Sequence, residues 1–174
     1  GGTETGMVVM GWDQVQHYTR RGDSELHPNS LVFNYANPKA AKGNFLQAAA
    51  DLSAVIKWAE GFSIPASESP TGEEIQINED KIYFMGHSQG ATTGPLVLPF
   101  GETVQGTVLS GAGADLRRAL LGKTSPANVP AGLSIALQTD SLRVNHPVLS
   151  ILQGYFESVD PLNYGRYIVS RRIE

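Results

Sequence analysis

The stretch that most restricts the fold of this chain is IYFMGHSQG, residues 82–90. Its first four residues form a short continuous apolar run, which is typical of a strand buried on both faces in a parallel sheet. A serine between two glycines follows, and residues 89–98 then favour a helix. Residues 103–109 form a second strand-like run. A strand, a helix and a strand in this order predict parallel pairing through a right-handed crossover, so the fold class is α/β.

The part before this unit contributes a further strand and a long helix. Residues 7–12, MVVMGW, are another continuous apolar run and predict a third buried strand. Asn37 and Pro38 predict a helix start, because Asn caps well and Pro at the first helical position loses no hydrogen bond. Apolar residues then recur at spacings of three and four as far as Gly61, which predicts a helix that lies on the sheet.

Two connecting segments are rich in turn residues and are predicted as loops. Residues 21–37 predict a long loop with Leu31–Phe33 tucked inward, and residues 63–80 predict an exposed acidic loop. Pro95 conflicts with the helix that follows the serine. A proline inside a helix costs about 3 kcal/mol, so the helix is expected to kink or restart at Gly94 and Pro95.

The composition excludes several classes of protein. The chain has 174 residues, 41% hydrophobic and 17% charged, which is enough for one domain, or part of one, with its own core. The net charge is −4 and no basic stripe occurs, so nucleic acid is not an expected partner. Cysteine is absent, which excludes disulfides and a thiol nucleophile. No apolar run approaches the roughly 18 residues of a membrane span, and the N-terminal residues do not resemble a signal peptide.

The serine at position 88 has two interpretations, an ordinary turn residue or a nucleophile. A serine hydroxyl becomes a useful nucleophile when it is exposed, close to a base and near donors for an oxyanion. A sharp turn between a strand and a helix provides that exposure, and Gly86 and Gly90 leave room for it. The helix that begins beside Ser88 makes the backbone N–H of Gln89 the expected oxyanion donor. The position after a strand and before a helix favours the nucleophile.

The segment of residues 82–90, which begins at Ile82, resembles the nucleophile elbow of α/β-hydrolases. Its GHSQG form, made by Gly86, His87, Ser88, Gln89 and Gly90, is similar to that of bacterial lipases and esterases. The likeness extends over about residues 7–170. It implies an α/β-hydrolase fold and hydrolysis of acyl esters or lipids through an acyl-enzyme on Ser88, without a cofactor or metal. It also suggests a secreted or periplasmic location, which the composition leaves open.

Residues 115–174 differ in character from residues 1–114, which are expected to form the central part of the hydrolase core. Helices are predicted at 115–121, 145–157 and 160–170, and residues 124–133 are predicted as a loop because they contain two prolines and a glycine. These helices resemble a helical cap inserted after a sheet strand. In lipase-like hydrolases a cap of this kind covers the serine and lines an acyl pocket. Core packing alone explains the same apolar faces, and the sequence does not decide between the two.

Two parts of the hydrolase pattern are missing. The Gly-rich oxyanion loop precedes the first strand of this chain in the family pattern, and the catalytic acid and histidine follow the nucleophile, each after a further strand. The downstream candidates are Asp115, Asp140, Asp160 and His146, and none follows a strand-like run in that order. We therefore expect an internal fragment of about three sheet strands and a cap. Its open sheet edges are expected to be completed by polypeptide from the same precursor.

The histidines give no clear general base. His17 and His27 lie in loops before the serine, His87 is its neighbour with the side chain aimed elsewhere, and His146 is expected to be a surface residue of a first helical turn. Asp13 and His17 alone are too few ligands for a metal site, so no metal catalysis is expected.

Two alternatives to the esterase remain open at this stage. A non-catalytic binding module would keep the fold and the elbow while lacking a base and an acid. A thioesterase, peptidase or polyester depolymerase would use the same machinery on another substrate.

Overall fold

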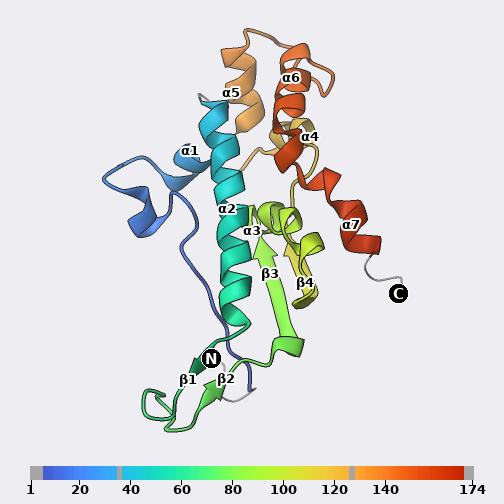
Figure 1. The fold of residues 1–174 in the computed structure, drawn as a ribbon. Coiled ribbons are helices and arrows are strands. Elements are labelled where there is room, and N and C mark those ends of the chain that lie inside the picture. The colour runs from blue at the N-terminus through green and yellow to red at the C-terminus, as the bar shows by residue number, and fades with distance from the viewer. Residues whose placement is uncertain (1–5, 35–36, 126–127, 171–174) are drawn as a thin grey trace. The chain divides into compact units, whose positions relative to one another are not determined.

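The computed structural model describes residues 6–34, 37–125 and 128–170. It is a mixed α/β structure, about half helical, with small sheets that include one pair of parallel strands (Figure 1). The chain forms two compact units, residues 1–84 with 100–107 and residues 85–99 with 108–174. Each unit is described by itself.

The first unit is organised around the long helix α2 (Pro38–Ala59). The side chain of Asn37 accepts a 3.1 Å hydrogen bond from the backbone N–H of Ala40, and Pro38 occupies the first helical turn, so the predicted helix start is confirmed. A short helix, α1 (Pro28–Phe33), packs against α2. Within the unit, the side-chain amide of Asn44 ties the two helices together by donating to the carbonyl oxygens of Leu31 and Val32, close to the end of α1.

Helix α1 corrects the prediction of a loop over residues 21–37. His27 caps this helix and Pro28 begins it, which is the same start signal that was recognised at Asn37. Of the apolar residues predicted to be tucked inward, Val32 is fully buried, whereas Leu31 and Phe33 are half-buried. Residues 35 and 36 lie outside the described part of the chain.

The strand predicted at residues 7–12 is absent from the structure. These residues form no ladder, and Met7, Val8, Val9 and Met10 are all exposed, Val9 to 83%. A strand needs a neighbouring strand to receive its backbone hydrogen bonds, and no described segment pairs with this one. An apolar run therefore was not sufficient to make a strand here.

The predicted loop at residues 63–80 contains a small antiparallel ladder. Strand β1 (Ser63–Ile64) pairs with β2 (Ile75–Gln76), with Ser63 opposite Gln76 and Ile64 opposite Ile75. The residues between the two strands are irregular and mostly exposed, as predicted.

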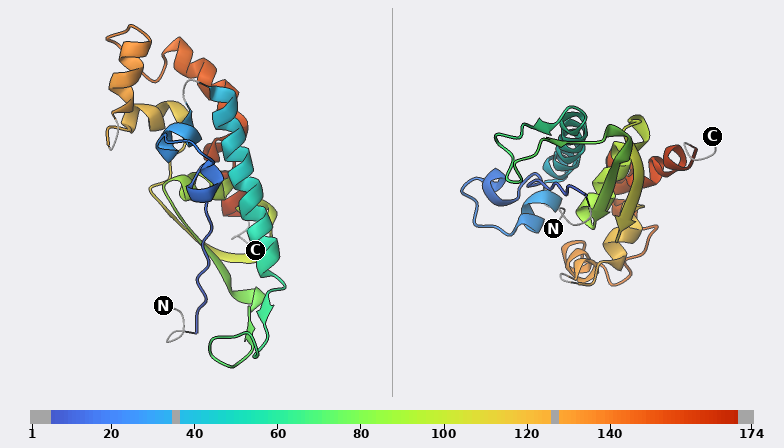
Figure 2. Two further views of the ribbon diagram at one scale, coloured as in Figure 1. Left: turned by 90° about the vertical axis from the view of Figure 1, so that its left-hand side faces the viewer. Right: turned by 90° about the horizontal axis from the view of Figure 1, so that it is seen from below.

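The two strands predicted around the serine are confirmed in position. They are β3 (Ile82–His87) and β4 (Val104–Ser110), which lie side by side as the parallel pair (Figure 2). The prediction that this strand is buried on both faces is wrong. Exposure alternates along β3, and its outer side chains, Tyr83 and Met85, are 64% and 75% exposed. The described residues therefore leave one face of β3 uncovered.

The second unit begins with the ends of these strands and helix α3 (Gln89–Thr93). The α-helix stops at Thr93 and the chain continues as a 3-10 turn over Gly94–Leu96, with Pro95 in its first positions. The restart predicted from Pro95 is confirmed, since a proline needs no N–H partner at the start of a turn.

Among the described residues of the second unit, β4 is followed by the α-helices α4 (Leu116–Gly122), α5 (Val129–Ala136), α6 (Pro147–Phe156) and α7 (Gly165–Ser170). Helix α4 packs against both α5 and α6, and Leu149 of α6 is fully buried. The described helices include none that is long and apolar enough to cross a membrane.

Helix α5 corrects the second half of the loop predicted at residues 124–133. Asn128 caps it by accepting from the backbone N–H of Ala131, and Pro130 falls in its first turn, where proline is tolerated. A proline that was interpreted as a loop signal is part of a helix start. Residues 126 and 127 lie outside the described part of the chain.

Candidate nucleophile elbow

Ser88 occupies the turn between β3 and α3 in a strained backbone conformation. Its φ is 50° and its ψ is −108°, a region that residues with a side chain rarely adopt. Such a conformation costs on the order of 1–3 kcal/mol and persists only where the surrounding structure enforces it. The residue is exposed, and its hydroxyl makes no capping hydrogen bond with the helix. The side chain is therefore held outward without a structural role for its oxygen.

Gly86 shows why the turn needs glycine. A Cβ atom at this position would lie 2.7 Å from the carbonyl carbon and oxygen of Gly90 and 2.8 Å from the backbone nitrogen of Ala91. These are backbone atoms that cannot move aside, so any larger residue at position 86 would force the strand and the helix apart. The close approach of Gly86 to Gly90 makes the turn sharp.

The backbone of Ser88 is held on both sides. Its N–H donates a 2.9 Å hydrogen bond to the carbonyl oxygen of Ser110 at the end of β4. Its carbonyl accepts from the backbone N–H of Thr92 at 3.0 Å and from the Thr92 hydroxyl at 3.1 Å. The Ser88 N–H is therefore already bonded, and the expected oxyanion donor, Gln89, is the first residue of α3.

The end of β4 lies directly beside the elbow. The imidazole Nδ1 of His87 is 3.2 Å from the hydroxyl of Ser110, with the donor set by the tautomer. Gly111 has a φ of +63°, and a Cβ there would lie 3.7 Å from the His87 ring and 3.9 Å from the Ser88 backbone nitrogen. His87 is thus directed to Ser110 rather than to the Ser88 hydroxyl, in agreement with its predicted orientation.

The other histidines have local roles. The Nδ1 atom of His17 is 3.0 Å from the Val15 carbonyl oxygen, and that of His27 accepts from the backbone N–H of Asn29. His146 precedes the first turn of α6 and is half-buried, with its Nδ1 buried and lacking a hydrogen-bond partner, so the expected surface position is corrected. Within the described second unit, no histidine hydrogen-bonds the Ser88 hydroxyl.

Asp115 and Asp160, two of the candidate acids, are committed to other partners, and the third, Asp140, is exposed in a loop. The carboxylate of Asp115 accepts from the guanidinium of Arg117 through two bonds of 2.9 and 3.1 Å. Hydrogen bonding to Arg117 holds the pKa of the Asp115 carboxyl below its ordinary value. Asp160 is 4% exposed, and all its hydrogen bonds come from neighbours other than histidine.

The sequence indicated only part of the role of Asp160. It predicted a helix cap at Asp160 and Pro161, and the side chain does cap the 3-10 turn Pro161–Asn163 by accepting from the Leu162 N–H. The same carboxylate also bonds the backbone at residues 115 and 116, which no local pattern indicates. Ser110 was likewise missed, because its contribution to the elbow is a backbone carbonyl that any residue supplies.

The described residues contain no group of three His, Cys, Asp or Glu side chains placed to hold a metal ion. Asp13 and His17 instead make contacts within the same segment, since Arg20 donates to the Asp13 carbonyl oxygen and the His17 ring lies against the Val15 carbonyl oxygen. Arg20 also forms an ion pair with Asp51 of α2.

The arrangement provides an exposed hydroxyl on a strained turn, a glycine contact that makes the turn sharp and one expected oxyanion donor. A base and an acid aligned with that hydroxyl are lacking among the described residues of the second unit. Comparison of the chain with protein-family models, curated proteins and solved structures gave no match.

Proposed function

We propose that this chain is part of a serine hydrolase that acts on carboxylic esters through an acyl-enzyme on Ser88. The observation that carries the proposal is the backbone of Ser88, at φ 50° and ψ −108° between β3 and α3. Strain at an exposed residue, without a structural hydrogen bond from its hydroxyl, is typical of a functional site rather than of an ordinary turn. The GHSQG sequence at this turn supports the same conclusion.

The chemistry follows from the position of the hydroxyl. The Ser88 oxygen attacks the ester carbonyl carbon while a histidine base takes its proton, and the Gln89 N–H donates to the oxyanion that forms. The alcohol leaves with a proton from the same base. Water then attacks the acyl-enzyme and releases the carboxylic acid and the free serine. The histidine, its acid partner and a second oxyanion donor are proposed to come from polypeptide outside this chain.

Uncovered apolar side chains support a complementing polypeptide from the same precursor. Val9 in the N-terminal run is 83% exposed, Met85 of β3 is 75% exposed and Val108 of β4 is 57% exposed. Strands normally avoid this exposure through a neighbouring strand or a covering layer. We propose that this polypeptide provides further strands beside β3 and β4 and a layer over their uncovered side chains, and that residues 1–114 belong to the core that it completes.

Residues 115–174 are proposed to form the cap that lines the acyl site. The cap helices carry exposed apolar side chains, Ile135 of α5 at 79% and Ile151 of α6 at 72%. Such side chains suit the acyl part of an ester or lipid substrate.

A fluorophosphonate probe tests the proposal on the intact protein, which here means this chain together with the proposed complementing polypeptide. The probe should label Ser88, and Ser88→Ala should abolish the labelling. Ser110→Ala is the matched control, because Ser110 is next to the elbow and holds it through a backbone carbonyl that the substitution keeps. Labelling that survives in Ser88→Ala, or a wild-type protein that is folded and unlabelled, would contradict the proposal.

A binding module with the same fold is the second candidate, favoured by one observation. Neither His87 nor His146, the two histidines of the second unit, bonds the serine hydroxyl. An intact protein that binds ester analogues but neither labels nor hydrolyses would support this alternative. A panel of esters, thioesters, peptides and polyesters separates the hydrolase classes.

A further inference from the structure

Asp160 is a buried carboxylate to which the proposed chemistry assigns no role. One of its oxygens accepts from the backbone N–H groups of Asp115 at 3.1 Å and Leu162 at 2.9 Å. The other accepts from the Leu116 N–H at 3.0 Å and from the side-chain amide of Gln153 at 2.8 Å. All four bonds lie within the second unit, so this carboxylate connects three separate segments, at the start of α4, in α6 and in the 3-10 turn Pro161–Asn163.

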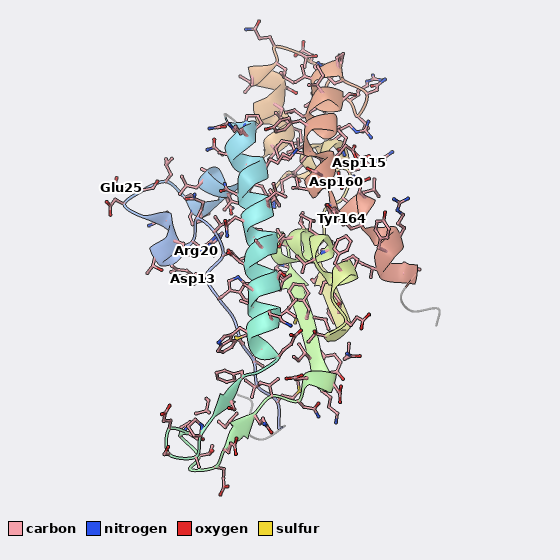
Figure 3. All side chains as sticks on the ribbon, viewed as in Figure 1. Asp13, Arg20, Glu25, Asp115, Asp160 and Tyr164 are labelled. Atoms are coloured by element: carbon pink, nitrogen blue, oxygen red, sulfur yellow. The ribbon has the colours of Figure 1, made fainter. Side chains whose placement is uncertain are left out.

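Asp160 supplies the cap that α4 lacks locally. Asp115 stands at the cap position of α4 but makes no side-chain cap bond, because its carboxylate is turned to Arg117. The first N–H groups of a helix need an acceptor, and here a residue 44–45 positions later provides it. Figure 3 shows Asp115 and Asp160 next to each other where α4 meets α6. Asp115 has a φ of 55°, so a strained backbone is held at this contact.

A short segment joins this contact to the elbow. Residues 110–115 begin at Ser110, whose carbonyl holds the Ser88 N–H, and end at Asp115. Between them, Gly113 packs against α4, since a Cβ there would lie 3.4 Å from the Cβ of Ala119. Residues with side chains avoid the φ of Asp115, so this residue is expected to relax when its N–H is released. The relaxation would move residues 110–115, and with them the Ser110 carbonyl that holds the Ser88 N–H.

We propose that Asp160 is a positioning residue for the Ser88 elbow, acting through Asp115 and the segment of residues 110–115. Its carboxylate fixes the end of that segment, and Ser110 at the other end fixes the Ser88 backbone. The effect on reactivity rests on the proposed function of Ser88, whereas the effect on the position of the elbow does not.

The test compares Asp160→Asn with Glu157→Gln in the intact protein. Asn keeps one acceptor oxygen and puts an amide group where the other stood. One pair of donors therefore loses its acceptor, either Asp115 and Leu162 or Leu116 and Gln153, and each pair includes an N–H group at the start of α4. Glu157→Gln removes the same charge three residues away and shares the Gln153 contact, but the hydrogen bonds of Glu157 go to Gln153 and Asn163. Each variant is measured by hydrogen exchange of the peptides that cover residues 85–92 and 108–116, and by saturation kinetics with a fluorophosphonate.

Asp160→Asn is expected to speed amide exchange in both peptides by about tenfold. It is also expected to lower the maximal labelling rate by about 10- to 100-fold, since small displacements of a nucleophile have effects of that size. The half-saturating probe concentration should change less than about twofold, because the probe site itself is untouched. Glu157→Gln should leave all three values near those of the wild type. If Asp160→Asn does not fold, Gln153→Met removes a single donor to Asp160 and should change the same values in the same direction.

The positioning role of Asp160 and the hydrolase function of Ser88 would be contradicted by different results. If Asp160→Asn loosens residues 108–116 while exchange around Ser88 and the labelling rate stay at wild-type values, Asp160 has a purely structural role and this inference is wrong. Equal effects of the two substitutions would overturn it as well. If the wild type does not label but exchange around Ser88 responds to Asp160 alone, the positioning stands and the hydrolase proposal is the one that fails.

Discussion

The backbone N–H of Ser88 donates a 2.9 Å hydrogen bond to the carbonyl oxygen of Ser110. This bond joins the turn after β3 to the end of β4, so the position of the serine depends on two strands rather than on its own turn. It also occupies the Ser88 N–H and leaves Gln89 as the expected oxyanion donor. Four experiments examine the consequences of this arrangement and of the surfaces around it.

Gly86→Ala should prevent the elbow from closing. The added Cβ would lie 2.7 Å from Gly90 backbone atoms, and overpacking against a backbone costs about 3 kcal/mol of the free energy of unfolding. Urea denaturation of the intact protein measures this, together with loss of fluorophosphonate labelling. Gly154→Ala in α6 is the matched control, since no atom lies within 4 Å of its Cβ position and Ala should stabilise a helix by about 0.5–1 kcal/mol. Equal stability of Gly86→Ala and wild type would contradict the close approach.

Ser88→Gly should be more stable than Ser88→Ala. Both variants remove the hydroxyl, but glycine adopts a φ of 50° without the strain of a Cβ, which corresponds to about 1 kcal/mol. The free energies of unfolding in urea give the difference. The same pair of substitutions at Ser150, an exposed position within α6, should show the opposite order, with Ala more stable by about 1 kcal/mol. Similar stability of the two Ser88 variants would mean that the residue is unstrained.

Arg117→Gln should reduce the acid sensitivity of the protein. The hydrogen bonds from Arg117 lower the pKa of Asp115 below the ordinary value of about 3.9. A lowered pKa stabilises the folded state above that ordinary value, and the contribution is lost as the pH falls through the lowered pKa. The urea midpoint should therefore fall less between pH 7 and pH 3 in Arg117→Gln than in the wild type.

Arg118→Gln provides the control for this titration. The Arg118 side chain is 72% exposed and its guanidinium lies 3.4 Å from the Asp115 carboxylate, so its contribution is screened by water. Its acid response should stay close to that of the wild type. An Arg117→Gln variant with an unchanged acid response would show that the ion pair does not affect stability.

Residues 1–174 on their own should self-associate and bind a hydrophobic dye. Met85 and Val108 are exposed on β3 and β4, Val9 is exposed in the irregular N-terminal segment, and exposed apolar surface favours association. Size-exclusion chromatography and the fluorescence of 1-anilinonaphthalene-8-sulfonate measure both properties. Co-expression with the proposed complementing polypeptide should suppress them. A monomeric chain that unfolds cooperatively by itself would contradict the need for a complementing polypeptide.

Several elements were predictable because their signals lie within a few residues of one another. Asn37 with Pro38 marked the start of α2, and Gly94 with Pro95 marked the end of α3. The apolar run before Gly86 predicted β3, and the glycines around Ser88 predicted the sharp turn. Helix α5 was missed because proline starts helices as well as interrupting them, and the capping role of Asn128 was not recognised.

The sequence by itself determined the α/β class, the parallel strands around the serine and the place of the elbow, since periodicity, caps and turn residues act locally. Only the tertiary structure decided that residues 7–12 form no strand, because a ladder needs a partner elsewhere in the chain. It also decided that Asp160 holds the start of α4, 44–45 residues away, and that Ser110 holds Ser88. Those bonds depend on how distant segments meet in space, and no short pattern of residues encodes that meeting.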